Sequence, residues 1–157
     1  MKTPILQASR MGQETAAATL LAAGAAANEI DEVGRTPLML AAGSGNAGLV
    51  AKLIAAGADV GRRDAEGRTP LLHALQRCRI GAAHVLLDHN AAKVSDKFGN
   101  SPLHVAARLC PDPLLFKKLI DGQDVNSADA AGRTALWHAA MQGNATLAAA
   151  LIESGAR

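Results

Sequence analysis

The clearest indication of the fold is a stretch in two parts, Thr36-Pro-Leu-Met-Leu-Ala-Ala-Gly-Ser-Gly45 and Leu49-Val-Ala-Lys-Leu-Ile-Ala-Ala-Gly-Ala-Asp-Val60. The threonine can cap a helix through its hydroxyl, and a proline suits the first helical position because its missing N–H costs nothing there. Gly45 and Gly57 each end a helix, since glycine readily adopts the left-handed conformation. Apolar residues recur at helical spacing in both halves. The stretch therefore predicts two short apolar helices joined by a tight turn.

This unit recurs along the whole chain. The Thr-Pro-Leu tripeptide or a close variant of it begins at residues 3, 36, 69, 101 and 134, with spacings of 33, 33, 32 and 33 residues. A helix pair of this size cannot bury its apolar faces alone, whereas stacked copies share one continuous core. We therefore expect residues 1–157 to form a single domain of five stacked units.

Three groups of residues resemble the ankyrin repeat family. Ser101-Pro102-Leu103-His104 is close to its Thr-Pro-Leu-His motif. Its Gly-Ala-Asp-Val-Asn ending is matched by Gly57-Ala58-Asp59-Val60 and by Asp124-Val125-Asn126. Its Asp-x-x-Gly-Arg-Thr hairpin is matched at Asp64–Thr69 and at Asp129–Thr134. The resemblance covers essentially the whole chain. It implies an all-α solenoid of helix–turn–helix units with projecting β-hairpin-like loops, a family whose members overwhelmingly act as protein-binding scaffolds.

The third and fourth copies depart from the pattern. Cys78 stands in place of the turn glycine, and Asn90 stands where the second helix should end. In the fourth copy, Cys110-Pro111-Asp112-Pro113 replaces the turn, and its prolines stop the first helix and rigidify the loop. We therefore expect the stack to be least regular between residues 75 and 123.

The two cysteines, Cys78 and Cys110, occupy equivalent places in adjacent copies. Stacked helices lie about 8–10 Å apart, whereas a disulfide usually needs Cα atoms within about 7 Å. We therefore expect two free thiols.

Composition excludes several classes of protein. Hydrophobic residues make up 49% of the chain and charged residues 19%, which is typical of a globular protein and not of a disordered tail. The net charge of +2 is too small to indicate binding to nucleic acid or to a membrane surface. No apolar run approaches the roughly 18 residues that span a bilayer. We expect the protein by itself to be a monomer.

Residues 1–27 fit two interpretations. Lys2 and Arg10 precede an alanine-rich apolar run, which is the order of a signal peptide. Glu14 beside the run, and its alanine rather than leucine content, favour the first structural repeat instead. We therefore expect a cytoplasmic location.

No motif indicates catalysis, a cofactor or a metal ion. Gly43–Gly48 has the letters of a dinucleotide fingerprint but follows a predicted helix, whereas that fingerprint requires a preceding strand. None of the five histidines has zinc-ligand spacing with cysteines. His104, at the family's Thr-Pro-Leu-His position, is expected to form a structural hydrogen bond between loops, and His73 and His138 are also expected to be structural.

The family resemblance places the binding surface on the concave side, at the hairpin tips and the exposed edge of the first helix in each unit. Arg68, Arg77, Phe98 and Arg108 are expected to contribute most, because arginine forms forked bonds to carboxylates and anchors interfaces. Trp137 is expected mainly to pack between hairpins. The candidate partner-binding residues are Arg35, Arg68, Gln76, Arg77, Lys97, Phe98, Asn100, Arg108, Leu109, Arg133, Met141 and Gln142.

Two functions fit these observations, and neither is enzymatic. The first is a scaffold that holds an acidic partner protein on its concave surface. The alternative is a small regulatory or inhibitory subunit, of the immunity type, that caps an enzyme or a toxin. A third class, an enzyme with an unrecognised site, has no positive support in the sequence.

Overall fold

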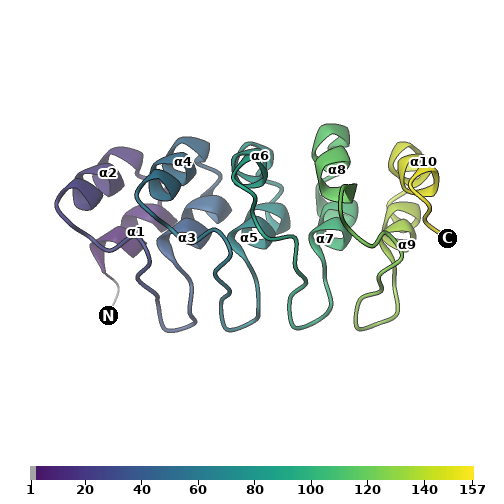
Figure 1. The fold of residues 1–157 in the computed structure, drawn as a ribbon, viewed down its shortest axis with the longest axis horizontal. Coiled ribbons are helices and arrows are strands. Elements are labelled where there is room, and N and C mark those ends of the chain that lie inside the picture. The colour runs from purple at the N-terminus through teal and green to yellow at the C-terminus, as the bar shows by residue number, and fades with distance from the viewer. Residues whose placement is uncertain (1–2) are drawn as a thin grey trace.

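Each copy of the repeat folds into a pair of helices, and the five pairs stand side by side in an elongated row (Figure 1). The computed structural model describes residues 3–157. Its ten helices are α1 (Pro4–Arg10), α2 (Glu14–Ala22), α3 (Pro37–Ser44), α4 (Ala47–Ala55), α5 (Pro70–Gln76), α6 (Ile80–Asp88), α7 (Pro102–Leu109), α8 (Pro113–Ile120), α9 (Ala135–Met141) and α10 (Ala145–Glu153).

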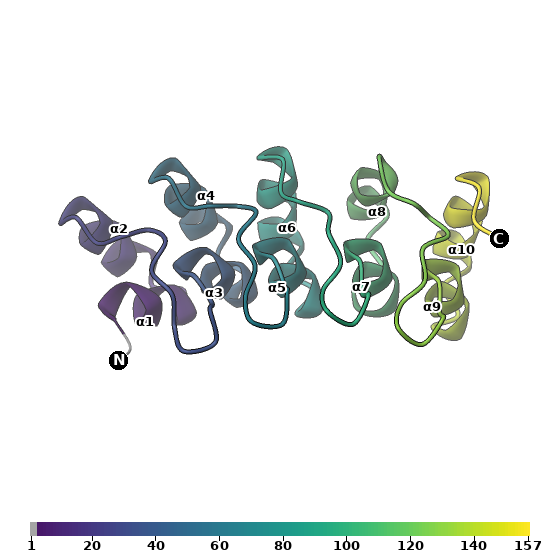
Figure 2. The same cartoon turned by 60° about the horizontal axis from the view of Figure 1, so that its bottom comes forward.

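The helices form two rows, and loops project beyond one of them. The odd-numbered helices make the lower row in Figure 1, the even-numbered helices make the upper row, and four hairpin loops hang below the lower row. Figure 2 shows the same loops turned toward the viewer. We call the odd-numbered helices together with the hairpin loops the inner face. The all-α solenoid predicted from the sequence is therefore confirmed.

The hairpin loops are β-like without forming a sheet within residues 3–157. In the second loop the Asp64 N–H donates to the Arg68 carbonyl at 3.0 Å, and the pattern recurs in the others. Neighbouring loops are joined by single backbone bonds, as from the Lys97 N–H to the Glu66 carbonyl at 3.0 Å. Ala128 and Thr134 form an isolated antiparallel bridge.

Hydroxyl side chains start the inner helices, as the sequence predicts. Thr36, Thr69, Ser101 and Thr134 each have extended backbone and accept the N–H of the residue three positions later. This bond satisfies one of the N–H groups that have no partner inside the helix. A proline follows in three of these four copies, and alanine follows Thr134.

Left-handed residues end the helices in the regular copies. Gly45 has a φ of 88° and Gly57 a φ of 87°. Among residues 3–157, the non-glycine residues with positive φ are Cys78 at 51° and Asn90 at 56°, and both lie in the segment expected to be irregular. Asn90 thus takes over the predicted glycine role. Cys110 instead adopts a φ of −142°, so the α7–α8 turn has a different shape.

The core is a single hydrophobic cluster, aliphatic apart from Phe116 and Cys110, that runs from Ile5 to Ala156. One leucine from each of the middle inner helices, Leu38, Leu71 and Leu103, is at most 1% exposed. The Ala41–Ala42 pair is fully buried, which agrees with its expected role of letting the second helix approach closely.

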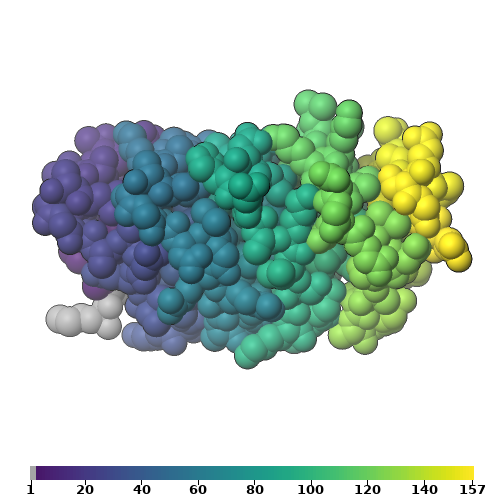
Figure 3. Space-filling model, viewed as in Figure 1, coloured from purple at the N-terminus to yellow at the C-terminus, as the bar shows by residue number. Residues whose placement is uncertain are grey.

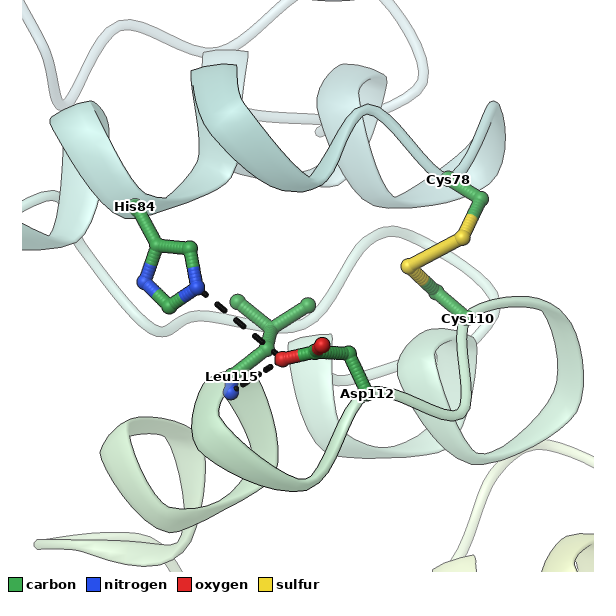
Figure 4. The surroundings of a disulfide bond; sticks show 5 residues. All are labelled: Cys78, His84, Cys110, Asp112 and Leu115. Carbon is green, nitrogen blue, oxygen red and sulfur yellow. Dashed lines mark hydrogen bonds and ion pairs between the residues drawn. A yellow bond between two sulfur atoms is a disulfide. The ribbon is translucent and has the colours of Figure 1, made fainter.

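The expectation of two free thiols is wrong. Cys78 and Cys110 form a disulfide that joins the α5–α6 turn to the α7–α8 turn (Figure 4). Their Cα atoms are 4.9 Å apart, well within disulfide range. The expectation failed because it used the distance between helix axes. Both cysteines lie in turns beyond the helix ends, where adjacent backbones approach more closely than the axes do.

No helix within residues 3–157 has the length and apolar character needed to cross a membrane. The same residues contain no cluster of three or more His, Cys, Asp or Glu side chains suited to holding a metal ion.

Truncation of Leu71 to alanine should lower the free energy of unfolding by about 3 kcal/mol, because it leaves a cavity between stacked repeats. Leu114→Ala provides the matched control, since Leu114 is 70% exposed on α8 and should cost under about 0.5 kcal/mol. Urea denaturation of both variants measures the difference. Equal losses would contradict a core shared by adjacent repeats.

Candidate functional site

An aspartate organises each hairpin loop of the inner face. In the second loop, Asp64 Oδ1 accepts the backbone N–H groups of Glu66 and Arg68, each at 2.9 Å. Its Oδ2 accepts the Arg68 Nε–H at 3.0 Å and lies 2.9 Å from His73 Nε2. Each carboxylate oxygen therefore receives two hydrogen bonds, and the turn is closed around a buried charge.

The same arrangement recurs with small variations. Asp129 binds Arg133 and His138 in the last loop, at 2.9 Å and 3.2 Å respectively. In the first loop Asp31 binds Arg35 at 2.8 Å. In the loop with Asp96, an asparagine at position 100 donates its side-chain amide in place of the arginine. The Asp-x-x-Gly motif is thus a structural element of every loop.

These bonds set the ionisation of the buried groups. Burial alone would raise the pKa of Asp64, but the hydrogen bonds from Arg68 and His73 outweigh it and lower that pKa below 3.8. The pKa of Asp129 is lowered much further, again against burial, by Arg133, His138 and the Ala131 N–H. Burial lowers the pKa values of His73 and His138 below 6.5 despite their aspartate partners. Both histidines are therefore neutral at pH 7.

Four predicted binding residues have their side chains engaged inside these turns. Arg35, Arg68, Arg133 and Asn100 each donate to the aspartate four positions earlier. Arg68 also pairs with Glu66 at 2.8 Å, and only 22% of its side chain is exposed. The positive charge of the three arginines is largely neutralised within the loops, which leaves less of it for a partner.

Two predicted residues at the hairpin tips point into solvent instead. Phe98 is 56% exposed, a large fraction for a phenylalanine. Lys97 is exposed beside it, and within residues 3–157 its ammonium forms no ion pair. The structure thus places an aromatic ring and a cation together at the tip of the third loop.

The remaining predicted residues gather at the C-terminal ends of the inner helices. Arg77 ends α5, Arg108 and Leu109 end α7, and Met141 ends α9. Leu109 is 42% exposed and Met141 66%. Among the described residues, neither arginine has a side-chain hydrogen bond or an ion pair. We call Gln76, Arg77, Arg108, Leu109, Met141 and Gln142 the helix-end group.

A shallow hollow lies within the helix-end group, between the fourth and fifth repeats. It measures about 660 Å³, and Arg108, Leu109 and Gln142 line it together with Pro111 and Asn144. The helix-end group is separated from the hairpin tips by the length of an inner helix. At 1.5 Å per residue, the eight residues of α7 span about 12 Å. The predicted residues therefore form two edges of one face and not a single patch.

The structural role expected for the histidines is confirmed. His104 lies 3.0 Å from the Arg133 carbonyl through Nε2, so it links one repeat to the next hairpin. Trp137 occupies the equivalent position in the last repeat and is 43% exposed. Its ring lies 5.3 Å from the Arg133 guanidinium, a cation–π contact within one hairpin unit.

A second hollow, which the sequence analysis did not predict, lies in the row of even-numbered helices. It measures about 410 Å³ between α8 and α10 and is lined by Phe116, Ile120 and Leu147 among others. Figure 3 shows the surface indented between these two helices. The signal that could have located it is the Cys110–Pro113 turn, which changes how α8 leaves α7.

Comparison with protein families identifies the repeat. The family described as "Ankyrin repeats (3 copies)" matches residues 1–64 and 40–113, and "Ankyrin repeat" matches residues 98–130. The chain belongs to the ankyrin repeat family. No curated protein matches it. Ankyrin repeats generally serve as protein–protein interaction modules.

Replacing Asp129 by alanine should destabilise this ankyrin repeat protein by about 2–4 kcal/mol, because it leaves the buried His138 and two backbone N–H groups without an acceptor. Asp121→Ala is the control, since Asp121 is exposed and its carboxylate forms no ion pair within the described chain. Thermal unfolding monitored by circular dichroism gives both values. Equal midpoints would show that the carboxylate does not organise the turn.

Stability should fall as the pH drops from 7 to 5. Because the folded chain holds His138 with a pKa below that of the unfolded chain, its contribution is complete above pH 6.5 and is lost as the pH falls through the folded value. Arg133, Arg108 and Asp129 are the charged groups that face it.

His138→Gln, which can still donate to Asp129, should flatten this dependence by up to about 1.4 kcal/mol per pH unit. Urea denaturation at pH 7, 6 and 5 measures the slope for both proteins. Parallel curves would exclude His138 as the group responsible.

Proposed function

We propose that this protein is a non-enzymatic scaffold that binds an acidic partner protein on its inner face. The observation that carries the proposal is the presence of unpaired cations, exposed at Arg77 and Lys97 and half-buried at Arg108, beside exposed apolar side chains. Arg77, Arg108 and Lys97 form no ion pair within residues 3–157, and Phe98, Leu109 and Met141 are between 42% and 66% exposed.

The basic residues of the inner face fall into two groups, those paired with aspartates inside the loops and those without an ion pair. The hairpin arginines are held by Asp31, Asp64 and Asp129 inside the loops. On the inner face, the cations outside these loop bonds, Arg77, Arg108 and Lys97, lie at its two edges, where a partner carboxylate could pair with them. Arginine and exposed aromatic or methionine side chains are the types enriched where interfaces hold their partners. A partner that presents carboxylates around an apolar centre would match both edges.

The double variant Arg77→Glu/Arg108→Glu tests this face. We expect a loss of at least about 100-fold in affinity for a partner isolated from the native source, because two attractive contacts become repulsive. Lys117→Glu/Arg157→Glu makes the same change in net charge at exposed positions outside the inner face, on α8 and at the last residue. Isothermal titration calorimetry of the three proteins against the purified partner measures the effect. An unchanged affinity in a folded Arg77/Arg108 variant would reject the proposal.

An activity assay of the same purified partner distinguishes a scaffold function from an inhibitory one. If the purified partner is an enzyme or a toxin whose activity stops on binding, the alternative function as a capping subunit is correct. Turnover by the ankyrin repeat protein itself would contradict both non-enzymatic functions.

The cytoplasmic location stays a prediction, and one finding weighs against it. Disulfides persist in oxidising compartments and are rare in the cytosol, where they are mostly transient. The Cys78–Cys110 bond is therefore more typical of an oxidising compartment than of the cytosol. Fractionation of the native cells, with each fraction probed for the protein, measures the location directly.

A further inference from the structure

The Cys78–Cys110 disulfide lies where the repeat pattern breaks. Three of the five copies place glycine at this turn position: Gly12, Gly45 and Gly143. Cys78 keeps the left-handed backbone of those glycines, with a φ of 51°, although a side chain makes that conformation unfavourable. The local backbone therefore favours glycine, and what a cysteine contributes at this position is the disulfide to Cys110.

The turn that contains Cys110 lacks a bond that other copies have. In the first, third and fifth copies, the residue after the turn position donates its N–H to a carbonyl five residues earlier, over 2.8–3.0 Å; these donors are Gln13, Arg79 and Asn144. The fourth copy has Pro111 at this position, and proline has no N–H. The α7–α8 turn therefore lacks the backbone hydrogen bond that would hold it at Pro111. The disulfide holds the turn covalently instead, at the preceding residue, Cys110.

Helix α8 is anchored by the buried Leu115 and Leu119 and by the ion pair from Lys118 to Asp88, but hollows flank it on both sides. The 410 Å³ hollow lies between it and α10, and a third hollow of about 550 Å³ opens between its C-terminal end and the end of α6. Lys93 holds the C-terminal end by donating to the Lys118 and Asp121 carbonyls, at 2.7 Å and 2.6 Å. At the N-terminal end, Asp112 caps the helix and lies 3.9 Å from His84 Nε2, close to the disulfide (Figure 4).

From these three observations we infer that the Cys78–Cys110 disulfide is a redox-sensitive clamp on the fourth repeat. When it is closed it fixes the α7–α8 turn and the start of α8. When it is reduced this segment loosens while the first two repeats keep their structure. The clamp bears on binding because Arg77 precedes Cys78 and Leu109 precedes Cys110. This consequence rests on the proposed function of the inner face.

The chemistry requires an external dithiol. Cys110 is fully buried and Cys78 is half-buried, so an incoming thiolate reaches the Cys78 sulfur, and the Cys110 sulfur leaves as a thiolate that takes up a proton. The second thiol of the reductant then displaces Cys78 from the mixed disulfide, and the Cys78 thiolate is protonated in turn. The reductant becomes a cyclic disulfide, and its two electrons and two protons end on the two cysteines.

Hydrogen exchange of the protein alone tests the clamp, with dithiothreitol as the dithiol. Amides of residues 110–121 should exchange about tenfold faster in the reduced protein, whereas amides of α3 and α4 should be unchanged. Equal protection of residues 110–121 in both states would overturn the inference, as would uniform loss of protection along the chain. Two free thiols by mass spectrometry after purification in air would overturn it as well.

Two variants sharpen the test. Cys78→Gly restores the glycine of the other copies and removes the disulfide, so it should show fast exchange at residues 110–121 with or without dithiothreitol. Pro111→Asn restores the missing N–H in the form that Asn144 has, and it should recover protection in the reduced protein. A reduced Pro111→Asn variant that stays as loose as the reduced wild type would contradict the account of the turn.

These measurements need no partner, so they stand apart from the calorimetry of the Arg77/Arg108 variant. With a partner in hand, the clamp predicts weaker binding by the reduced protein. If the clamp fails, residues 110–121 are equally protected in both states whatever the partner does. If the proposed function fails, the charge-reversal variant binds normally whatever the exchange shows.

Discussion

Leu38, Leu71 and Leu103 are removed almost completely from water in a cluster that continues from the first helix to the last. Burial of each such side chain contributes about 1.5–3 kcal/mol, and it depends on a neighbouring repeat being in place. A pair of helices seven to nine residues long has no core of its own, so each repeat is stable only as part of the stack. This dependence gives the molecule its elongated form and leaves one long face available.

The hairpin loops are built on a different interaction. A buried carboxylate accepts backbone and side-chain donors within one turn, and single backbone bonds tie each loop to the next. This arrangement fixes the conformation of the loops, and it also pairs Arg35, Arg68 and Arg133 with aspartates inside the loops. The basic character of the inner face therefore depends on residues outside the loop motif, at the helix ends and at one loop tip.

The fourth repeat shows how the stack accommodates an irregular unit. Prolines in its α7–α8 turn remove a hydrogen bond, and the helix that follows lies between two hollows. The disulfide joins this turn to the preceding repeat, and Lys93 from the segment between α6 and α7 holds the opposite end of α8. Covalent and polar contacts thus take over where close helix packing is incomplete.

The repeat, the helix starts and turns, and the mainly aliphatic core could be predicted from the sequence, because each follows from residues within one copy of the unit and from its regular spacing. Thr36 caps the helix that Pro37 begins, Gly45 ends it, and a spacing near 33 residues places equivalent leucines in register. The folded structure was needed to show which basic residues of the inner face form no ion pair and that the two cysteines are bonded to each other. The side-chain bond from Arg68 to Asp64 and the 4.9 Å approach of Cys78 to Cys110 depend on how turns fold and lean together, which spacing along the chain does not specify.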